Sequence, residues 1–170
     1  MLRPATDDDR DRLLAWRNHP QVREMSLTQH EITVAEHDAW WQRTQTDPTR
    51  QVFLYVRHDV PSGVVTFFDL DAQARSAWWG YYLDNEGLSA RGELLPAWIE
   101  IQRQAKRFAF DELGLETLEG EVLEANEAVR RFNRRNGFEE VAREVRDVGG
   151  QEVAVWHVRA TRSSSERTKR

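Results

Sequence analysis

The stretch from Ala77 to Phe138 places the strongest limit on how this chain can fold. A strand, AWWGYYLD, runs into a glycine-marked loop, NEGLSARG, and the loop opens a long helix that begins at Glu93. About one helix and one strand later comes a second motif, NEAVRRFNRRNGF. A strand that ends in a turn at a helix N-terminus presents unpaired backbone N–H groups and the positive end of the helix dipole, which suit a phosphate group. We therefore expect a phosphate-bearing cofactor at this turn.

Helices are predicted on both sides of this stretch. Thr6 and the acids after it begin a helix that ends near Pro20. The capping-box spacing of Thr33–Glu36 begins a second helix, which should bury Trp40 or Trp41. The two later helices follow Glu93 and Asn126, and each has a glycine where a helix commonly stops, at positions 114 and 137.

The strands alternate with these helices. They are predicted to begin at residue 2 and to cover residues 51–56, 64–69, 76–83, 117–123, 138–145 and 152–158. Turns at Pro61–Gly63 and Asp71–Arg75 join three of them into an antiparallel meander. The order is β-α-α-β-β-β-α-β-α-β-β, which predicts a mixed α/β sheet with parallel and antiparallel pairs.

Chain length and composition favour one domain. The chain has 170 residues, of which 39% are apolar, enough to bury one core. We expect the domain to span residues 1–160. Residues 161–170 are rich in Ser, Thr and Arg, with no apolar residue after Ala160, so they are predicted to form a disordered tail.

Several function classes are disfavoured by composition. The chain has no Cys, and its five His show no H-x-x-x-H spacing, so no metal site is expected. The net charge of −5 disfavours broad nucleic-acid binding. No apolar run is long enough to span a membrane, and the N-terminus MLRPATDDDR lacks the apolar region of a signal peptide, so a cytoplasmic location is expected.

From Leu2 to about Val158 the motifs resemble those of the GNAT superfamily of acetyl-coenzyme A-dependent N-acetyltransferases. The loop Gly87–Gly92 stands where that family has R/Q-x-x-G-x-G/A, and its last glycine matches. The segment from Asn126 through Phe132 to Arg134-Arg135-Asn136-Gly137-Phe138 is similar to the family ending N…(Y/F)…K/R-x-GF. The resemblance implies acetyl-coenzyme A as cofactor and a splayed central strand pair that receives its pantetheine arm.

Coenzyme contacts are implied by the same resemblance. The splayed strand would supply backbone N–H groups that stabilise an oxyanion. The positions that match the family's coenzyme site are Tyr81, Tyr82, Leu83, Leu88, Ser89, Ala90, Arg91, Gly92, Glu93, Asn126, Phe132, Asn133 and Arg135.

A narrower resemblance concerns the acceptor. The segment Trp16-Arg17-Asn18-His19-Pro20 and the later Glu36-His37…Trp40 are similar to the branch of nucleotide-amino-sugar N-acetyltransferases and ribosomal-protein N-terminal acetyltransferases. In that branch this segment borders the acceptor site, which implies acceptor contacts for Trp16, Arg17 and Asn18. The alternative is that Trp16 packs in the core and the other two simply end a helix.

The usual acid and base positions of the family carry other residues here. Trp78 stands where many members have a Glu base, and Asn133 stands where a Tyr often protonates the leaving thiolate. An amide cannot deliver a proton at neutral pH, although it can donate a hydrogen bond to sulfur. Candidates to replace the base are Asp69 and Glu121. The alternative for each is a surface residue, with water as the proton acceptor.

Two function classes remain open from the sequence. The first is an N-acetyltransferase that acts on a primary amine of a small molecule, with an amino sugar or sugar nucleotide favoured over a peptide N-terminus; an aminoglycoside is a further possibility within this class. The second is an acyl-coenzyme A-binding module without turnover, which the departures at Trp78 and Asn133 would explain. A homodimer is a further expectation, which rests on the apolar run Val153–Val158 alone.

Overall fold

The structure is a computed structural model that describes residues 1–148 and 150–167. Its strands are β1 (Leu2–Pro4), β2 (Gln51–Arg57), β3 (Val60–Asp71), β4 (Ser76–Leu83), β5 (Thr117–Leu123), β6 (Phe138–Val148) and β7 (Gln151–Thr161). Its α-helices are α1 (Arg10–Arg17), α2 (Pro20–Glu24), α3 (Val34–Thr46), α4 (Asn85–Ala90), α5 (Leu94–Arg107), α6 (Glu127–Arg135) and α7 (Arg162–Arg167). A 3₁₀ turn, η1 (Asp7–Asp9), precedes α1, and a π-helical turn, η2 (Phe108–Glu112), follows α5.

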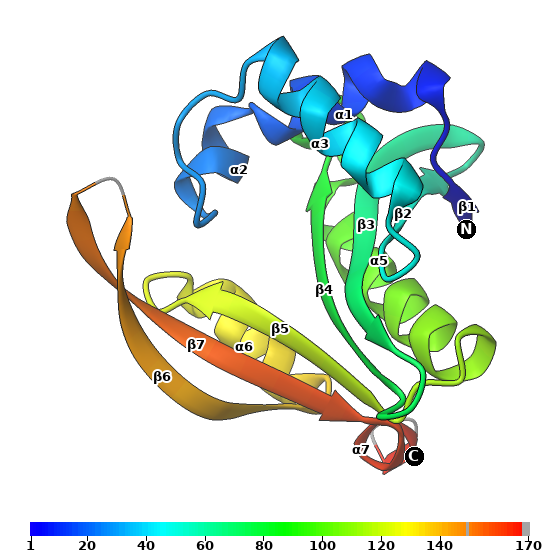
Figure 1. The fold of residues 1–170 in the computed structure, drawn as a ribbon, viewed down its shortest axis with the longest axis vertical. Coiled ribbons are helices and arrows are strands. Elements are labelled where there is room, and N and C mark those ends of the chain that lie inside the picture. The colour runs from blue at the N-terminus through cyan, green and yellow to red at the C-terminus, as the bar shows by residue number, and fades with distance from the viewer. Residues whose placement is uncertain (149, 168–170) are drawn as a thin grey trace.

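The strands form one seven-stranded mixed sheet in the order β1-β2-β3-β4-β5-β7-β6. Its only parallel pair among the described residues is β4 with β5, and this pair is short: Ser76, Ala77 and Trp78 lie opposite Thr117, Leu118 and Glu119. Beyond Trp78 the two strands diverge, so the sheet opens into a V with β1–β4 in one arm and β5–β7 in the other (Figure 1). The predicted mixed sheet with a splayed central pair is confirmed.

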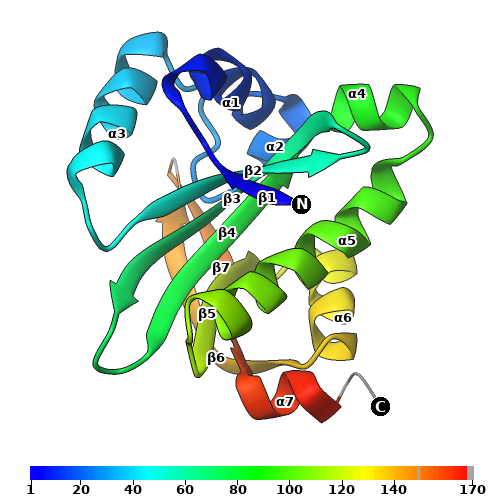
Figure 2. The same ribbon diagram turned by 90° about the vertical axis from the view of Figure 1, so that its right-hand side faces the viewer.

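Helices cover the two faces of the sheet unequally. Helix α5 packs on one face, where Ala97, Ile101 and Ala105 are fully buried against strand residues such as Phe67 (Figure 2). On the opposite face of the first arm, Leu13 of α1 and Trp41 of α3 form a second core with residues of β2 and β3. Burial of Trp41 agrees with the prediction for the second helix.

Local differences from the predicted elements have clear causes. The strands 76–83 and 117–123 have the predicted bounds. The turn predicted at Pro61–Gly63 is wrong, because these residues lie inside β3 and the chain reverses at His58 and Asp59, which adopt φ values of 47° and 62°. The loop predicted over residues 85–92 instead contains α4, capped by the Asp84 side chain, which accepts a hydrogen bond from the Gly87 N–H at 2.9 Å.

The predicted disordered tail is wrong for residues 161–167. Thr161 belongs to β7, and α7 follows it. Arg162 donates a hydrogen bond to the carbonyl of Leu115, and the Ser164 hydroxyl donates to the carbonyl of Gly137. These contacts to the body of the protein explain the order, while the last three residues of that prediction, 168–170, lie outside the described residues. Among the helices that the structure describes, none is long and apolar enough to cross a membrane.

Candidate active site

A cleft of about 420 Å³ lies where β4 and β5 separate. The first arm contributes Trp79–Leu83 of β4, and the second contributes Gly120–Leu123 of β5. Helices α5 and α6 close one side of the cleft, and the segment from the end of α1 to Thr28 borders the other. The cleft therefore connects the face of the sheet that α5 and α6 cover with the inner face of the V.

Beyond Trp78, one edge of β4 has no partner strand among the described residues, and its backbone groups point into this split. Asp84 donates its backbone N–H to the carbonyl of Ser62 on β3, at 3.0 Å. Successive residues of a strand direct their backbone groups to opposite edges, so Tyr82 shares the direction of Asp84, while Tyr81 and Leu83 direct their N–H groups away from β3. Since β5 has already diverged, these two N–H groups are the candidate donors to an oxyanion.

The predicted phosphate-binding turn is largely engaged with itself. The N–H groups of Leu88, Arg91, Gly92 and Glu93 all donate to backbone carbonyls within residues 84–89. The Leu88 side chain is fully buried. Four of the N–H groups expected to hold phosphate are therefore already paired.

Other groups beside that turn can still receive an anion. Leu94 and Leu95 are the first two residues of α5, and N–H groups at such positions have no acceptor within their own helix. Arg91 also stands at this turn, where its guanidinium lies 3.3 Å from a carboxylate oxygen of Glu93. The fit to a coenzyme pyrophosphate thus rests on the α5 N-terminus and Arg91.

Helix α6 brings two predicted residues to the cleft. Asn126 caps the helix, because its side-chain oxygen accepts from the Val129 N–H at 3.3 Å. Asn133 lines the cleft with only 6% of its surface exposed, and its Oδ1 accepts from Gln102 Nε2 at 2.7 Å. Phe132 instead packs its ring against Trp98, and Arg135 is exposed outside the cleft lining.

Of the three predicted acceptor residues, the structure brings only Arg17 to the cleft. Its Nη2 donates to the carbonyl of Thr28 at 3.1 Å, whereas its Nη1 is buried with no hydrogen-bond partner among the described residues. Burial lowers the pKa of this guanidinium, and the nearby positive charge of Arg23 lowers it further. Arg17 therefore presents an unsatisfied cationic donor.

Asn18 and Trp16 have structural surroundings. The Asn18 side chain exchanges two hydrogen bonds with the backbone of Ile32, at 2.8 and 2.9 Å. Trp16 is partly buried against the core beneath α1 and α3. Neither lines the cleft.

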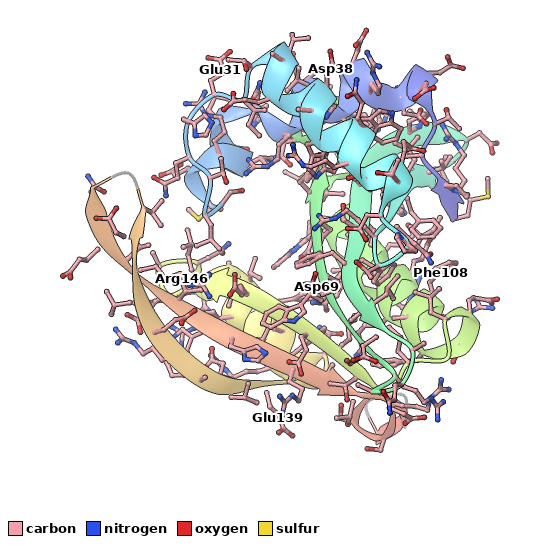
Figure 3. All side chains as sticks on the ribbon, in the orientation of Figure 1. Glu31, Asp38, Asp69, Phe108, Glu139 and Arg146 are labelled. Atoms are coloured by element: carbon pink, nitrogen blue, oxygen red, sulfur yellow. The ribbon has the colours of Figure 1, made fainter. Side chains whose placement is uncertain are left out.

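The two predicted carboxylates differ in position. Glu121 carries the one carboxylate among the described residues of the cleft lining, and Arg146 holds it with two hydrogen bonds, one of 2.9 Å. Asp69 is exposed near the end of β3 and is not part of the lining (Figure 3). Trp78, at the position of the family's base, stacks on His157 with 4.7 Å between ring centroids. Glu121 is therefore the carboxylate nearest to the proposed reaction.

One cleft residue, Trp98, and its contact with the predicted residue Tyr81 were missed from the sequence. Trp98 follows the apolar period of its helix, a pattern typical of core residues, yet it lines the cleft and donates its indole N–H to the Tyr81 hydroxyl at 2.6 Å. Helical spacing cannot separate a core residue from one at the rim of a cleft, so no local signal could have found this contact.

Comparison with known proteins identifies the class. A sequence profile described as the acetyltransferase (GNAT) domain matches residues 1–139, and the chain therefore belongs to this family of acetyltransferases, which use acetyl-coenzyme A. Two proteins named acetyltransferase PseH, from two strains of Campylobacter jejuni, are 25% and 24% identical to the chain over 126 residues, which is 74% of each chain. The predicted family, enzyme class and cofactor are confirmed.

Solved structures show the same fold. The spermidine N-acetyltransferase of Vibrio cholerae, in complex with CoA and spermine, superposes with a TM-score of 0.80. The match covers 98% of this chain and 97% of that chain at 16% sequence identity. At this identity the likeness concerns the fold, and the acceptor has to be argued from the cleft itself.

Proposed function

We propose that this acetyltransferase modifies the primary amine of a small molecule that also carries an anionic group, such as an amino-sugar nucleotide. The observation that carries the proposal is the buried, unpartnered Nη1 of Arg17 in the cleft. Leaving a buried charged donor without a partner is costly, and a phosphate or carboxylate of the acceptor would satisfy it.

The charges of the cleft fit such an acceptor. Among the described residues, the lining of the cleft contains one cationic side chain, that of Arg17, and one anionic side chain, that of Glu121. They come from opposite walls, α1 and β5. An acceptor with an ammonium near Glu121 and an anion near Arg17 would match both. A polyamine or an aminoglycoside carries only positive charge and would leave Arg17 opposed to a cation.

The chain's own residues can support the transfer in a ternary complex. Bound acetyl-coenzyme A supplies an activated thioester carbonyl for direct attack. The N–H groups of Tyr81 and Leu83 would stabilise the negative charge that develops on the carbonyl oxygen, an effect typically worth about 3 kcal/mol for each donor. Glu121 would attract the ammonium into the cleft and accept its proton, directly or through water. To do so it would give up a hydrogen bond from Arg146 and form one with the acceptor's amine.

The remaining predicted residues have smaller proposed roles. Asn133 and Asn126 would contact the pantetheine arm, because both line the cleft on the α6 side. The N-terminus of α5 and Arg91 would hold the pyrophosphate. Arg135, on the exposed face of α6, could reach only the outer phosphate of the coenzyme.

The test is thiol release with matched acceptors. An amino-sugar nucleotide, the same amino sugar without the nucleotide, and spermidine would be compared with the wild-type chain and with Arg17→Gln. We expect the nucleotide acceptor to be preferred, and Arg17→Gln to raise its KM about 10- to 100-fold, since a hydrogen bond to a charged group contributes about 1.5–3 kcal/mol. The KM of the amino sugar without the nucleotide, which has no anionic group for Arg17, should stay the same. A preference for spermidine that survives in Arg17→Gln would refute the proposal.

A further inference from the structure

We infer that the Tyr81 hydroxyl donates a hydrogen bond to the coenzyme sulfur as the thiolate departs, at the step for which Asn133 can offer only an amide. The inference rests on the proposed transfer from acetyl-coenzyme A. The amine nitrogen forms a bond to the acetyl carbon, the carbon–sulfur bond breaks, and its electron pair stays on sulfur. The proton lost by the amine leaves through Glu121 or water, and Tyr81 keeps its own proton throughout.

The hydrogen-bonding state of Tyr81 carries the argument. Its oxygen accepts from Trp98 Nε1 at 2.6 Å, so the hydroxyl hydrogen must point elsewhere. Within residues 1–148 and 150–167 this hydroxyl has no acceptor. A buried hydroxyl with its acceptor side filled and its donor side free is prepared for an incoming acceptor.

The neighbouring tyrosine has the opposite arrangement. Tyr82 lies on the other face of β4, packs beside the core under α1, and donates its hydroxyl hydrogen to the carbonyl of Leu13 at 3.3 Å. Tyr81 packs on the face covered by α5. Of these two adjacent tyrosines, Tyr82 donates its hydroxyl hydrogen within the protein, whereas Tyr81 does not among the described residues.

The surroundings of Tyr81 place its hydroxyl beside the family's sulfur-binding position. Trp98 and Gln102 are four residues apart on α5 and face the same way. Trp98 donates a hydrogen bond to Tyr81 and packs its ring against Phe132 in a tilted arrangement, at 4.4 Å between ring centroids. Gln102 donates a hydrogen bond to Asn133, the next residue of α6. Tyr81 of β4 and Asn133 of α6 thus contact adjacent turns of α5, and both line the cleft.

The role as a hydrogen-bond donor follows from the burial of Tyr81. Burial raises the pKa of its hydroxyl, and the hydrogen bond from Trp98 lowers it only in part. A coenzyme thiolate, from a thiol whose reference pKa is about 8.5, would not remove a proton from such a phenol, yet it would accept a hydrogen bond from it. The thiolate is therefore stabilised without being protonated.

The test is the titration of enzyme-bound coenzyme A, followed by the ultraviolet absorbance of the thiolate. In Tyr81→Phe the pKa of the bound thiol should rise by about one pH unit, a tenfold loss of thiolate stabilisation. Tyr82→Phe is the matched control and should leave the titration where it is in the wild type. Trp98→Phe keeps Tyr81 but removes its partner, and should shift the titration in the same direction by less.

A kinetic readout separates this inference from the choice of acceptor. Hydroxylamine is largely unprotonated at neutral pH and needs no contact with Arg17, so its acetylation reports on departure of the leaving group. Tyr81→Phe should slow it about tenfold with acetyl-coenzyme A, and much less with the seleno analogue, whose selenol is more acidic than the thiol.

Each failure has its own signature. An unshifted thiol titration in folded Tyr81→Phe, or an equal shift in Tyr82→Phe, would overturn the inference. If Tyr81→Phe does not fold, an unshifted titration in Trp98→Phe would overturn it. Failure of the wild-type chain to bind coenzyme A would instead refute the coenzyme site on which it rests.

Discussion

The two arms of the sheet are built differently. In the first arm, β2 and β3 are buried on both faces, by α5 on one side and by α1 and α3 on the other. In the second arm, the inner face carries ion pairs such as Arg146 with Glu121, and β6 is exposed over most of its length. The cleft has one wall from each arm.

Because of this difference, the two arms contribute different kinds of groups to the site. Groups that must be held still, such as the backbone donors and the hydroxyl of Tyr81, belong to β4 of the first arm, where close packing fixes them. Glu121, which has to exchange partners, belongs to the second arm, where an exposed ion pair costs little to rearrange. Substitutions in the first arm should therefore reduce stability, and those on the inner face of the second should mainly change activity.

The largest expected effect on stability is in the core between α5 and the sheet. Phe67 is fully buried and contacts the rings of Phe53 and Phe108, the last of which is labelled in Figure 3. Phe67→Ala should lower the free energy of unfolding by about 3–5 kcal/mol, since it removes a buried ring and leaves a cavity. In the second arm, Val145→Ala should change it by less than about 0.5 kcal/mol, because Val145 is 53% exposed. Urea unfolding would measure both, and equal losses would break the comparison.

The next largest effect on stability is expected at two carboxylates, Asp9 and Glu124, which have similar pKa values but differ in burial. Hydrogen bonding by Arg3 lowers the pKa of buried Asp9 to about 2, and hydrogen bonding by Arg143 lowers that of Glu124 to about 2. Because the folded pKa of Asp9 lies below its usual value, its contribution is complete above about pH 4 and is lost as the pH falls toward 2.

Asp9→Asn should therefore lower the free energy of unfolding by about 2 kcal/mol at pH 7 and reduce its decline between pH 4 and 2. Glu124 is more exposed than Asp9, so solvent screens its ion pair, and Glu124→Gln should have a clearly smaller effect. Denaturant unfolding across this pH range measures both variants. If Glu124→Gln lowered the free energy of unfolding more than Asp9→Asn, the claim that the first arm contributes most of the stability would be contradicted.

A smaller effect, on activity, is expected at Glu121. Glu121→Gln should lower kcat/KM for the amine acceptor about tenfold, less than the 10²–10⁴ typical of a general base, because Arg146 already engages this carboxylate. Acetylation of hydroxylamine should change little, since that nucleophile is already unprotonated at neutral pH and can lose its remaining proton to water after the attack. An unchanged kcat/KM for the amine would leave solvent water as the proton acceptor.

The smallest effect is expected for the partner of Glu121. Arg146 is 38% exposed and belongs to the polar inner face, so Arg146→Gln should change the free energy of unfolding by less than about 1 kcal/mol. The same substitution frees Glu121 and should lower the KM of the amine. A loss comparable to that in Phe67→Ala would show that the second arm depends on its ion pairs.

Much of the fold could be predicted from the sequence. Strands β4 and β5 have their predicted bounds because turn or cap residues flank each of them. The hairpin before β3 was misplaced because His58 and Asp59 adopt positive φ without glycine, while Pro61–Gly63 look like a turn and are extended. Helix α4 was missed because its Gly87 suggested a loop.

The site was less predictable because its important contacts are long-range. Arg17 could be selected because its segment resembles the acceptor-site segment of the nucleotide-amino-sugar branch, although its unpartnered Nη1 depends on how Thr28 and Arg23 pack around it. The bond from Trp98 to Tyr81 joins α5 to β4, and no local pattern encodes it. Asn18 was selected for the acceptor site, but the structure gives it a partner in the backbone of Ile32.

The central claim is that acetyl transfer takes place where β4 and β5 separate. The most direct measurement is a crystal structure with a non-reactive acetyl-coenzyme A analogue. We predict that its carbonyl oxygen lies about 3 Å from the backbone nitrogen of Tyr81 or Leu83. A coenzyme seated instead in the larger cavity of about 800 Å³ beside α5, which Arg103 and Arg107 help to line, would contradict the account.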